Sequence, residues 1–233
     1  MSDIIAVGGA GFLTDPANVA LEKYILDQAG TDRPRVLMIA TARGDAVEYV
    51  AKCHAAFASL GARTQHLPLF DRTPELRAAI LSQDVIYVGG GNTKSMLAVW
   101  RDWGLVEILR EASSAGIVMS GQSAGAICWF EQGVTDSWAD RLRPLDCVGL
   151  LDGSCCPHYD GEPERRPAYH ALVKQGALKE GIAIDDRVAA HFKNGRLERV
   201  VSKRSGAKAY HVSVRNGEIV ERAFDATLLP GVS

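Results

Sequence analysis

The sequence predicts an α/β protein whose mostly parallel sheet carries helices on both faces and is followed by an antiparallel β meander. Up to about residue 132, short apolar runs alternate with amphipathic stretches, which is typical of right-handed βαβ units. The run at 35–40 is continuously apolar after its first residue, as in a strand buried on both faces. Beyond residue 180 the pattern changes to short strands separated by turns such as Lys193-Asn194-Gly195.

Each predicted element follows from its local pattern and the residues that bound it. Asp15 is a suitable N-cap in front of Pro16, so a helix is expected over 16–28. Gly61 is expected to end the helix that precedes it. The strands after residue 180 are expected to form a meander on one edge of the sheet. No linker or repeat interrupts the chain, which predicts one domain over residues 1–233. Further strands are expected at 4–7, 64–69, 85–88 and 117–120, and further helices at 45–60, 74–82, 93–102 and 104–114.

Composition restricts the class of protein. The 233 residues are 47% hydrophobic and 23% charged, with a net charge of −2 and no charged block. These values are typical of a globular protein and argue against nucleic acid or an anionic membrane as a partner. The first residues carry an acid where a signal peptide needs positive charge, so we expect a cytoplasmic protein. The five cysteines are odd in number and lack C-x-x-C spacing, which argues against a disulfide framework or a zinc site.

The stretch Gly121-Gln122-Ser123-Ala124-Gly125 matches G-x-S-x-G between an apolar strand and an apolar helix start. In this context the motif predicts a sharp turn that exposes a nucleophilic serine at the end of a strand. Small residues must flank such a turn, and Gly121, Ala124 and Gly125 meet that requirement. The alternative is a tight βα turn without a catalytic role.

Two glycine-rich turns also follow predicted strands. Gly8 to Gly11 does not match G-x-G-x-x-G, because Leu13 stands where the last glycine should fall, so a dinucleotide site is disfavoured. The turn from Gly89 to Asn92 should share the sheet edge with Ser123, where its backbone N–H groups could bind an oxyanion. Phosphate binding is the alternative, but the lysine of a P-loop is not in place.

A nucleophilic serine needs a base, and His158 is the best placed of six histidines because it lies on a loop after Pro157. Asp185 and Asp186 end a predicted strand, and Asp136 follows the nucleophile helix. The Ser-Asp-His order of α/β-hydrolases would instead require His191 or His211, but the long first half of that fold is missing. The order Ser123, His158, Asp186 indicates a different scaffold.

Four motifs make the whole chain resemble peptidase family S51, which includes aspartyl dipeptidase (peptidase E) and cyanophycinase. They are V-G-G-G-N-T at 88–93, S-G-Q-S-A-G-A at 120–126, C-P-H-Y-D at 156–160 and G-I-A-I-D-D at 181–186. The resemblance implies a class I glutamine-amidotransferase-like scaffold with serine in place of the elbow cysteine. It further implies Ser123 as nucleophile, His158 as base, and Gly91 and Ala124 as oxyanion donors.

The third catalytic residue stays open, since family members place an acid at positions matching either Asp186 or Asp136. A strand end is the firmer platform, which favours Asp186. The resemblance implies hydrolysis of N-terminal Asp-X peptides through an acyl-enzyme, without metal or cofactor, by a monomer or homodimer. Arg165 and Arg166 are candidates for binding a substrate carboxylate, with Asn92 and Gln122 as further substrate-binding candidates. The alternatives are an esterase or amidase, or a catalytically silent binding protein on the same scaffold.

Overall fold

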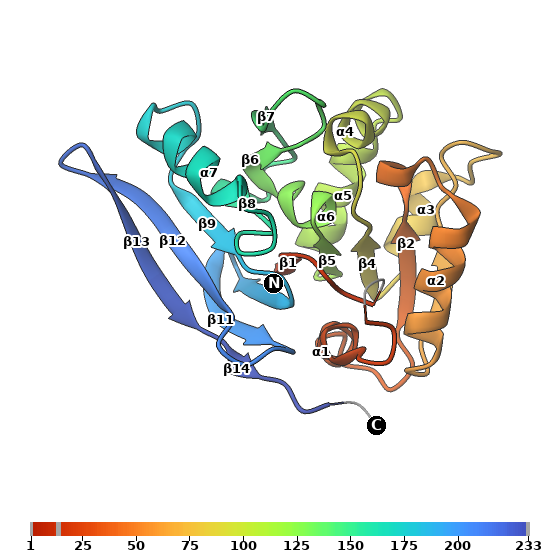
Figure 1. Cartoon of the computed structure of the whole chain (residues 1–233). Helices are drawn as coiled ribbons and strands as arrows, with labels where there is room; N and C mark the ends of the chain where they lie inside the picture. Colours follow the sequence, from red (N-terminus) through yellow and green to blue (C-terminus); the bar gives the residue numbers. More distant parts are fainter. Residues whose placement is uncertain (1, 13–14, 232–233) are drawn as a thin grey trace.

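The larger of two β-sheets runs through the middle of the protein (Figure 1). The computed structural model describes residues 2–12 and 15–231, so Leu13 lies outside the described residues. In this part of the chain the larger sheet has eight strands in the order β14-β11-β10-β1-β5-β4-β2-β3. All neighbours pair in parallel except β10, which is antiparallel to both β1 and β11. The bounds are β1 Asp3–Val7, β2 Arg35–Ile39, β3 Arg63–His66, β4 Val85–Val88, β5 Val118–Gln122, β10 Val188–Lys193, β11 Arg196–Ser202 and β14 Thr227–Leu228.

A second sheet of the described residues has six strands in the order β13-β12-β9-β8-β6-β7. The pairs β6–β8 and β8–β9 are parallel, and the remaining neighbours are antiparallel. Figure 1 shows the long β12–β13 hairpin extending away from the first sheet. The bounds are β6 Phe130–Thr135, β7 Arg143–Asp146, β8 Leu151–Cys156, β9 Gly181–Ile184, β12 Lys208–Arg215 and β13 Glu218–Asp225.

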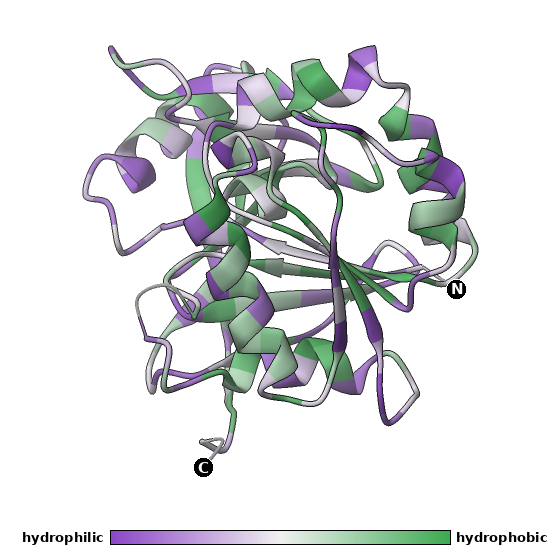
Figure 2. Ribbon diagram, turned by 90° about the vertical axis from the view of Figure 1, so that its right-hand side faces the viewer, coloured by the Kyte–Doolittle hydropathy of each residue, from purple (hydrophilic) through white to green (hydrophobic). Residues whose placement is uncertain are grey.

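Helices cover both faces of the eight-stranded sheet. One core cluster joins alternate residues of its strands to α1 and α2, and the other joins the intervening residues to α3–α6 and to the second sheet. Helix α7 packs on the six-stranded sheet through Tyr169 and Val173. Figure 2 shows largely hydrophobic strands between helices of mixed character. No helix of the described residues is long and apolar enough to cross a bilayer. The bounds are α1 Ala20–Asp27, α2 Val47–Ala58, α3 Leu76–Leu81, α4 Thr93–Asp102, α5 Leu105–Ser114, α6 Ala124–Ile127 and α7 Arg165–Lys174, with a short 3₁₀ helix, η1, at Thr41–Arg43.

Strand register brings three turns together at one edge of the large sheet. The end of β5 lies between β1 and β4, with Gln122 opposite Val7 and Gly121 opposite Val88. Since these three strands are parallel, the turns that follow them lie side by side. This edge is where ligands bind in open parallel sheets.

The predicted mostly parallel sheet with helices on both faces is confirmed, and so are antiparallel strands after residue 180. Their expected packing as one meander on one edge is wrong. Strands β10 and β11 join the large sheet next to β1, whereas β9, β12 and β13 belong to the second sheet. Strands β6, β7 and β8 lie in a part of the chain, 130–156, for which the sequence predicts no strand. Sequence patterns identify a strand, but its partner is chosen by contacts distant in sequence.

The first helix also differs from the prediction. It begins at Ala20 rather than at Pro16, and its N-cap is Val19 rather than Asp15. The Asn18 N–H instead donates to the Asp15 carbonyl, closing a turn. Lys203 lies 3.7 Å from the Asp15 carboxylate and donates to the Asn18 carbonyl. A contact far away in sequence therefore stabilises the turn where local propensity favours a helix.

We expect Gly125→Ala to destabilise the protein by about 1–3 kcal/mol, because a methyl group there overpacks the junction between α6 and β4. An ideal Cβ on Gly125 would lie 2.1 Å from the Val88 carbonyl oxygen, a backbone atom that cannot rotate away. Urea unfolding followed by circular dichroism measures the change. Gly231→Ala is the matched control, since no atom lies within 4 Å of its Cβ position. Equal midpoints for the two variants would contradict this account.

Candidate active site

Ser123 occupies a strained turn between β5 and α6. Its backbone has φ 55° and ψ −113°, a conformation that a residue with a side chain rarely adopts. The Ser123 N–H donates to the Val7 carbonyl over 3.0 Å, and the serine carbonyl accepts the first hydrogen bonds of α6. Gly121 and Gly125 both pack against the Val88 carbonyl, where a Cβ would collide. This geometry is the predicted strand–turn–helix elbow.

His158 lies between Ser123 and Asp186. Its Nε2 is 2.9 Å from Ser123 Oγ, and its Nδ1 is 2.7 Å from Asp186 Oδ1. An ionised carboxylate only accepts, so Nδ1–H donates to Asp186 and leaves Nε2 free to accept the serine proton. The histidine and aspartate side chains are 20% and 23% exposed, so the pair is mostly enclosed but still reachable.

Main-chain hydrogen bonds fix the segments that carry this pair. His158 has φ 54°, and its N–H donates to the Gly8 carbonyl over 3.1 Å. The Arg187 N–H donates to the Gly9 carbonyl over 2.9 Å. A Cβ on Gly9 would meet the His158 ring at 2.2 Å, and one on Gly161 would meet Asp186 Oδ2 at 2.1 Å. The two glycines therefore enclose the histidine–aspartate pair from two sides.

The turn after β4 presents one unused N–H group beside the serine. The N–H groups of Gly89, Gly90 and Asn92 donate to Ile39, Tyr49 Oη and Ala42 respectively. The Gly91 N–H has no hydrogen-bond partner among the residues that the structure describes. A Cβ on Gly90 would lie 3.2 Å from Ser123 Cβ, which places this turn against the serine. Ala124 is the first residue of α6, so its N–H has no acceptor within the helix.

Asp136, the alternative third residue, contacts Arg165 instead of the histidine. Its Oδ2 lies 3.3 Å from Arg165 Nη2, and its side chain is 62% exposed. The Arg165 side chain is 2% exposed and donates to Glu162 and to the Val134 carbonyl. Arg165, a candidate for binding a substrate carboxylate, is thus a buried guanidinium already paired with two protein carboxylates.

Arg166 is likewise paired within the protein. Its guanidinium donates to Glu221 and lies 5.2 Å from the centre of the Tyr159 ring. Burial alone would raise the pKa of the Glu221 carboxyl, but hydrogen bonds from Tyr159, Arg166 and His170 outweigh it and lower that pKa. The Glu221 carboxylate on β13 therefore holds the guanidinium of Arg166, which lies in the first turn of α7.

The other two predicted substrate-binding side chains are also engaged or buried. Asn92 caps α4 by accepting from the Ser95 N–H, and its amide donates to the Ser137 carbonyl. Gln122 is 5% exposed, and its Oε1 lies beside Gly11. Asn92 remains close to the Gly91 turn, whereas Gln122 points into the protein.

The protein thus has an α/β fold with a serine elbow at the edge of a mostly parallel sheet. The family model described as peptidase family S51 matches residues 4–200. The chain belongs to peptidase family S51 and is a peptidase.

Relatives of similar sequence agree with this assignment, and a solved structure shares the fold. The chain is 50% identical over 222 residues to the uncharacterized peptidase YgaJ of Bacillus subtilis (strain 168), covering 95% of this chain and 96% of that protein. It is 29% identical over 176 residues to peptidase E of Haemophilus influenzae, covering 71% of this chain and 76% of that protein. The crystal structure of a peptidase from an acI-B1 Actinobacterium has the same fold, with a TM-score of 0.75, 20% identity, and coverage of 100% of this chain and 97% of that one.

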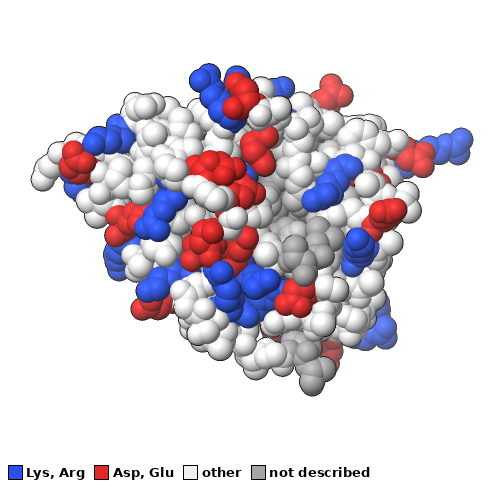
Figure 3. All heavy atoms as spheres, viewed as in Figure 1, with Lys and Arg blue, Asp and Glu red and all other residues white. Residues whose placement is uncertain are grey.

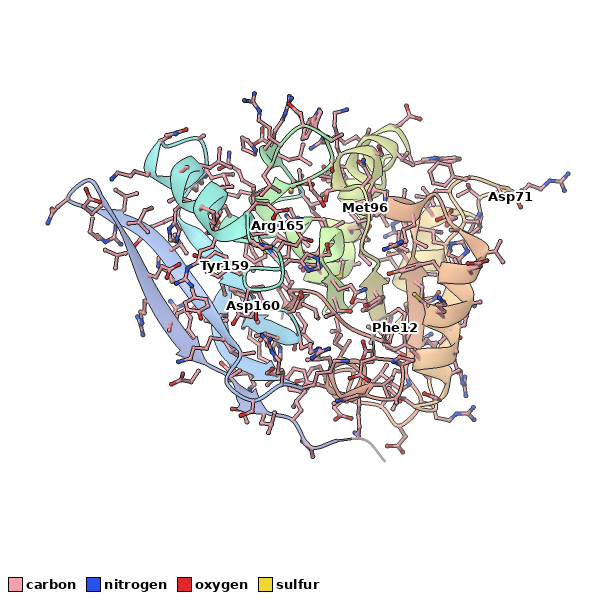
Figure 4. All side chains as sticks on the ribbon, in the orientation of Figure 1. Phe12, Asp71, Met96, Tyr159, Asp160 and Arg165 are labelled. Atoms are coloured by element: carbon pink, nitrogen blue, oxygen red, sulfur yellow. The ribbon has the colours of Figure 1, made fainter. Side chains whose placement is uncertain are left out.

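Sequence reasoning missed several residues that the structure brings to the site. Gly161, Tyr49 and Arg204 carried no signal, because only the folded chain brings them to the site, whereas Gly9 lies in the glycine-rich turn that follows the first predicted strand. Asp160 had one signal, its place at the end of the C-P-H-Y-D motif. In Figure 4 Tyr159, Asp160 and Arg165 are labelled on the segment that leads from β8 into α7.

We expect Gly161→Ala to lower kcat for peptide hydrolysis by about 100-fold, since displacing catalytic groups by about 1 Å has an effect of that size. The added methyl group would displace the Asp186 carboxylate from His158 Nδ1. The colliding atom belongs to a side chain that can rotate, so the fold should survive, which circular dichroism checks. Steady-state kinetics on a dipeptide gives kcat. Gly231→Ala serves again as the control, and wild-type kcat in Gly161→Ala would refute the proposed packing.

Proposed function

We propose that this protein is a serine-type peptidase that hydrolyses short peptides through an acyl-enzyme. Ser123 is the nucleophile, His158 the general base, and Asp186 the residue that orients the histidine. One observation carries the proposal: His158 contacts Ser123 Oγ with one ring nitrogen and Asp186 Oδ1 with the other. The cytoplasm stays the proposed location.

In this mechanism His158 Nε2 accepts the proton of Ser123 as Oγ attacks the scissile carbonyl. The Asp186 carboxylate stabilises the imidazolium that results and keeps Nε2 directed at the serine. The imidazolium then gives its proton to the leaving amine, which departs as the C–N bond breaks. Water, deprotonated by the same histidine, attacks the acyl-enzyme and releases the acid product and the free serine.

The negative charge of each tetrahedral intermediate needs donors that are already in position. The N–H groups of Gly91 and Ala124 fit this role because no protein acceptor among the described residues uses the first, and helix geometry leaves the second free. Each such donor contributes about 3 kcal/mol to lowering the barrier. Both are backbone groups, so they undergo little reorganisation during the reaction.

Short peptides are the substrate class, with N-terminal Asp-X dipeptides as the first to test. Support comes from the relative named peptidase E and from the motifs shared with aspartyl dipeptidase. Arg165 and Arg166 are not part of this proposal, because both are paired with protein carboxylates. A panel of Asp-X, Glu-X and Ala-X dipeptides, a β-aspartyl-arginine compound and a simple ester would separate peptidase from esterase specificity.

A fluorophosphonate probe should label the wild-type protein and fail to label Ser123→Ala. The probe reacts only with an activated serine, which Ser123 becomes when His158 accepts its proton. Labelling is read by intact-protein mass spectrometry, alongside dipeptide hydrolysis. Ser205→Ala, a change of an exposed serine in the turn between β11 and β12, is the matched control and should keep both. A wild-type protein that is never labelled and never turns over would instead be a silent binding protein.

Exchange of each candidate acid for its amide tests the third residue. Asp186→Asn should lower kcat by about 10³- to 10⁴-fold, because an amide facing Nδ1 favours the wrong tautomer of the base. Asp136→Asn should leave kcat close to wild type, since that carboxylate pairs with Arg165. Both variants are measured with the same dipeptide under saturating conditions. The reverse pattern would assign the orienting role to Asp136.

A further inference from the structure

Three successive N–H groups hold the turn that carries Asp186. The Asp185 N–H donates to the Lys208 carbonyl over 3.1 Å, and the Arg187 N–H donates to the Gly9 carbonyl over 2.9 Å. Between them, the Asp186 N–H donates to Asp160 Oδ1 over 2.8 Å. Of these three acceptors only Asp160 is a side chain, so it is the one that mutation can remove.

Asp160 also lies two residues after the proposed base. Its carboxylate therefore links the loop of His158 directly to the turn of Asp186. A displacement of the loop would displace the turn as well. Tyr159 also links the two segments, because its N–H donates to the Ile184 carbonyl at the end of β9. The 2.7 Å contact between His158 Nδ1 and Asp186 Oδ1 thus depends on the neighbouring hydrogen bond from the Asp186 N–H to Asp160.

Arg204 holds the second oxygen of the same carboxylate. Its guanidinium donates to Asp160 Oδ2, and this hydrogen bond raises the pKa of Arg204. It comes from the segment between β11 and β12, a third part of the chain. Figure 3 shows acidic side chains gathered on this face with a group of basic side chains directly below them. Without Arg204, the Asp160 carboxylate would have no ion-pair partner among the described residues, close enough to Asp185 that the charge of Asp160 helps to raise the pKa of the Asp185 carboxyl.

We propose that Asp160 and Arg204 are positioning residues of the active site: Asp160 fixes the backbone of Asp186 relative to His158, and Arg204 fixes Asp160. The inference rests on the proposed function, since Asp186 matters only if His158 acts as the base. In this proposal both residues act through Asp186 and His158 rather than on the substrate. Their contribution is the alignment of the histidine with its acid, which affects the chemical step rather than substrate binding.

The test is a graded series of kcat and KM for dipeptide hydrolysis. Asp160→Ala removes both contacts and should lower kcat about 10- to 100-fold with KM unchanged, as expected for small misalignments. Asp160→Asn keeps an oxygen that can accept the Asp186 N–H and should restore most of kcat. The kcat of Arg204→Lys should exceed the kcat of Arg204→Ala, because lysine retains a cation that can pair with Asp160. The rate of fluorophosphonate labelling should follow kcat through the series.

Asp27→Ala is the matched control, because it breaks the exposed ion pair with Lys23 on α1 and should leave kcat unchanged. Wild-type kcat in Asp160→Ala, or no recovery in Asp160→Asn, would overturn the inference while Ser123→Ala and His158→Ala stay inactive. Full activity in Ser123→Ala would overturn the proposed function itself. If Asp160→Ala does not fold, the comparison of Arg204→Lys with Arg204→Ala decides, and equal rates would overturn the inference.

Discussion

The strained backbone at Ser123 is the constraint on which the rest of the site depends. A positive φ at a residue with a side chain costs free energy of order 1–3 kcal/mol and persists only where the surroundings enforce it. Here the Ser123 N–H is bound by Val7 of β1, and the flanking glycines press against Val88 of β4. The spacing of three parallel strands therefore sets the direction of one hydroxyl. That spacing also brings the Gly91 turn beside it.

The two sheets supply different parts of the site. The eight-stranded sheet carries Ser123 after β5 and the Gly91 turn after β4. In the six-stranded sheet, β8 ends just before His158 and β9 ends just before Asp186. After Asp186 the chain enters β10 of the large sheet. His158 and Asp186 thus lie at the junction of the two sheets, and Ser123 at the end of β5 contacts His158 from the large sheet. Correct packing of one sheet on the other is then a condition for the contact between His158 and Ser123.

How much the sequence could predict follows from which interactions are local. Buried parallel strands and the G-x-S-x-G elbow are local patterns, so the large sheet and Ser123 could be found without coordinates. His158 and Asp186 could be proposed from their places on a loop and at a strand end, but pairing them needed the family resemblance, because nothing local indicates that residues 28 positions apart share a hydrogen bond. The turn at 15–18 depends on Lys203, and the division of the last strands depends on pairing with β1 and β8. Such contacts are fixed only by the folded chain.

The contrast between Asp136 and Asp186 shows why residue type and position were not enough to assign roles. Both acids lie close in sequence or space to the site, but their environments differ. Asp136 faces the buried Arg165, whose charge is compensated by Glu162 and Asp136 together. A buried guanidinium without such partners would be strongly destabilising, so this carboxylate serves the fold. Asp186 has no cation within ion-pairing distance among the described residues except the histidine itself. In the proposed mechanism this carboxylate is therefore available to stabilise the imidazolium of His158.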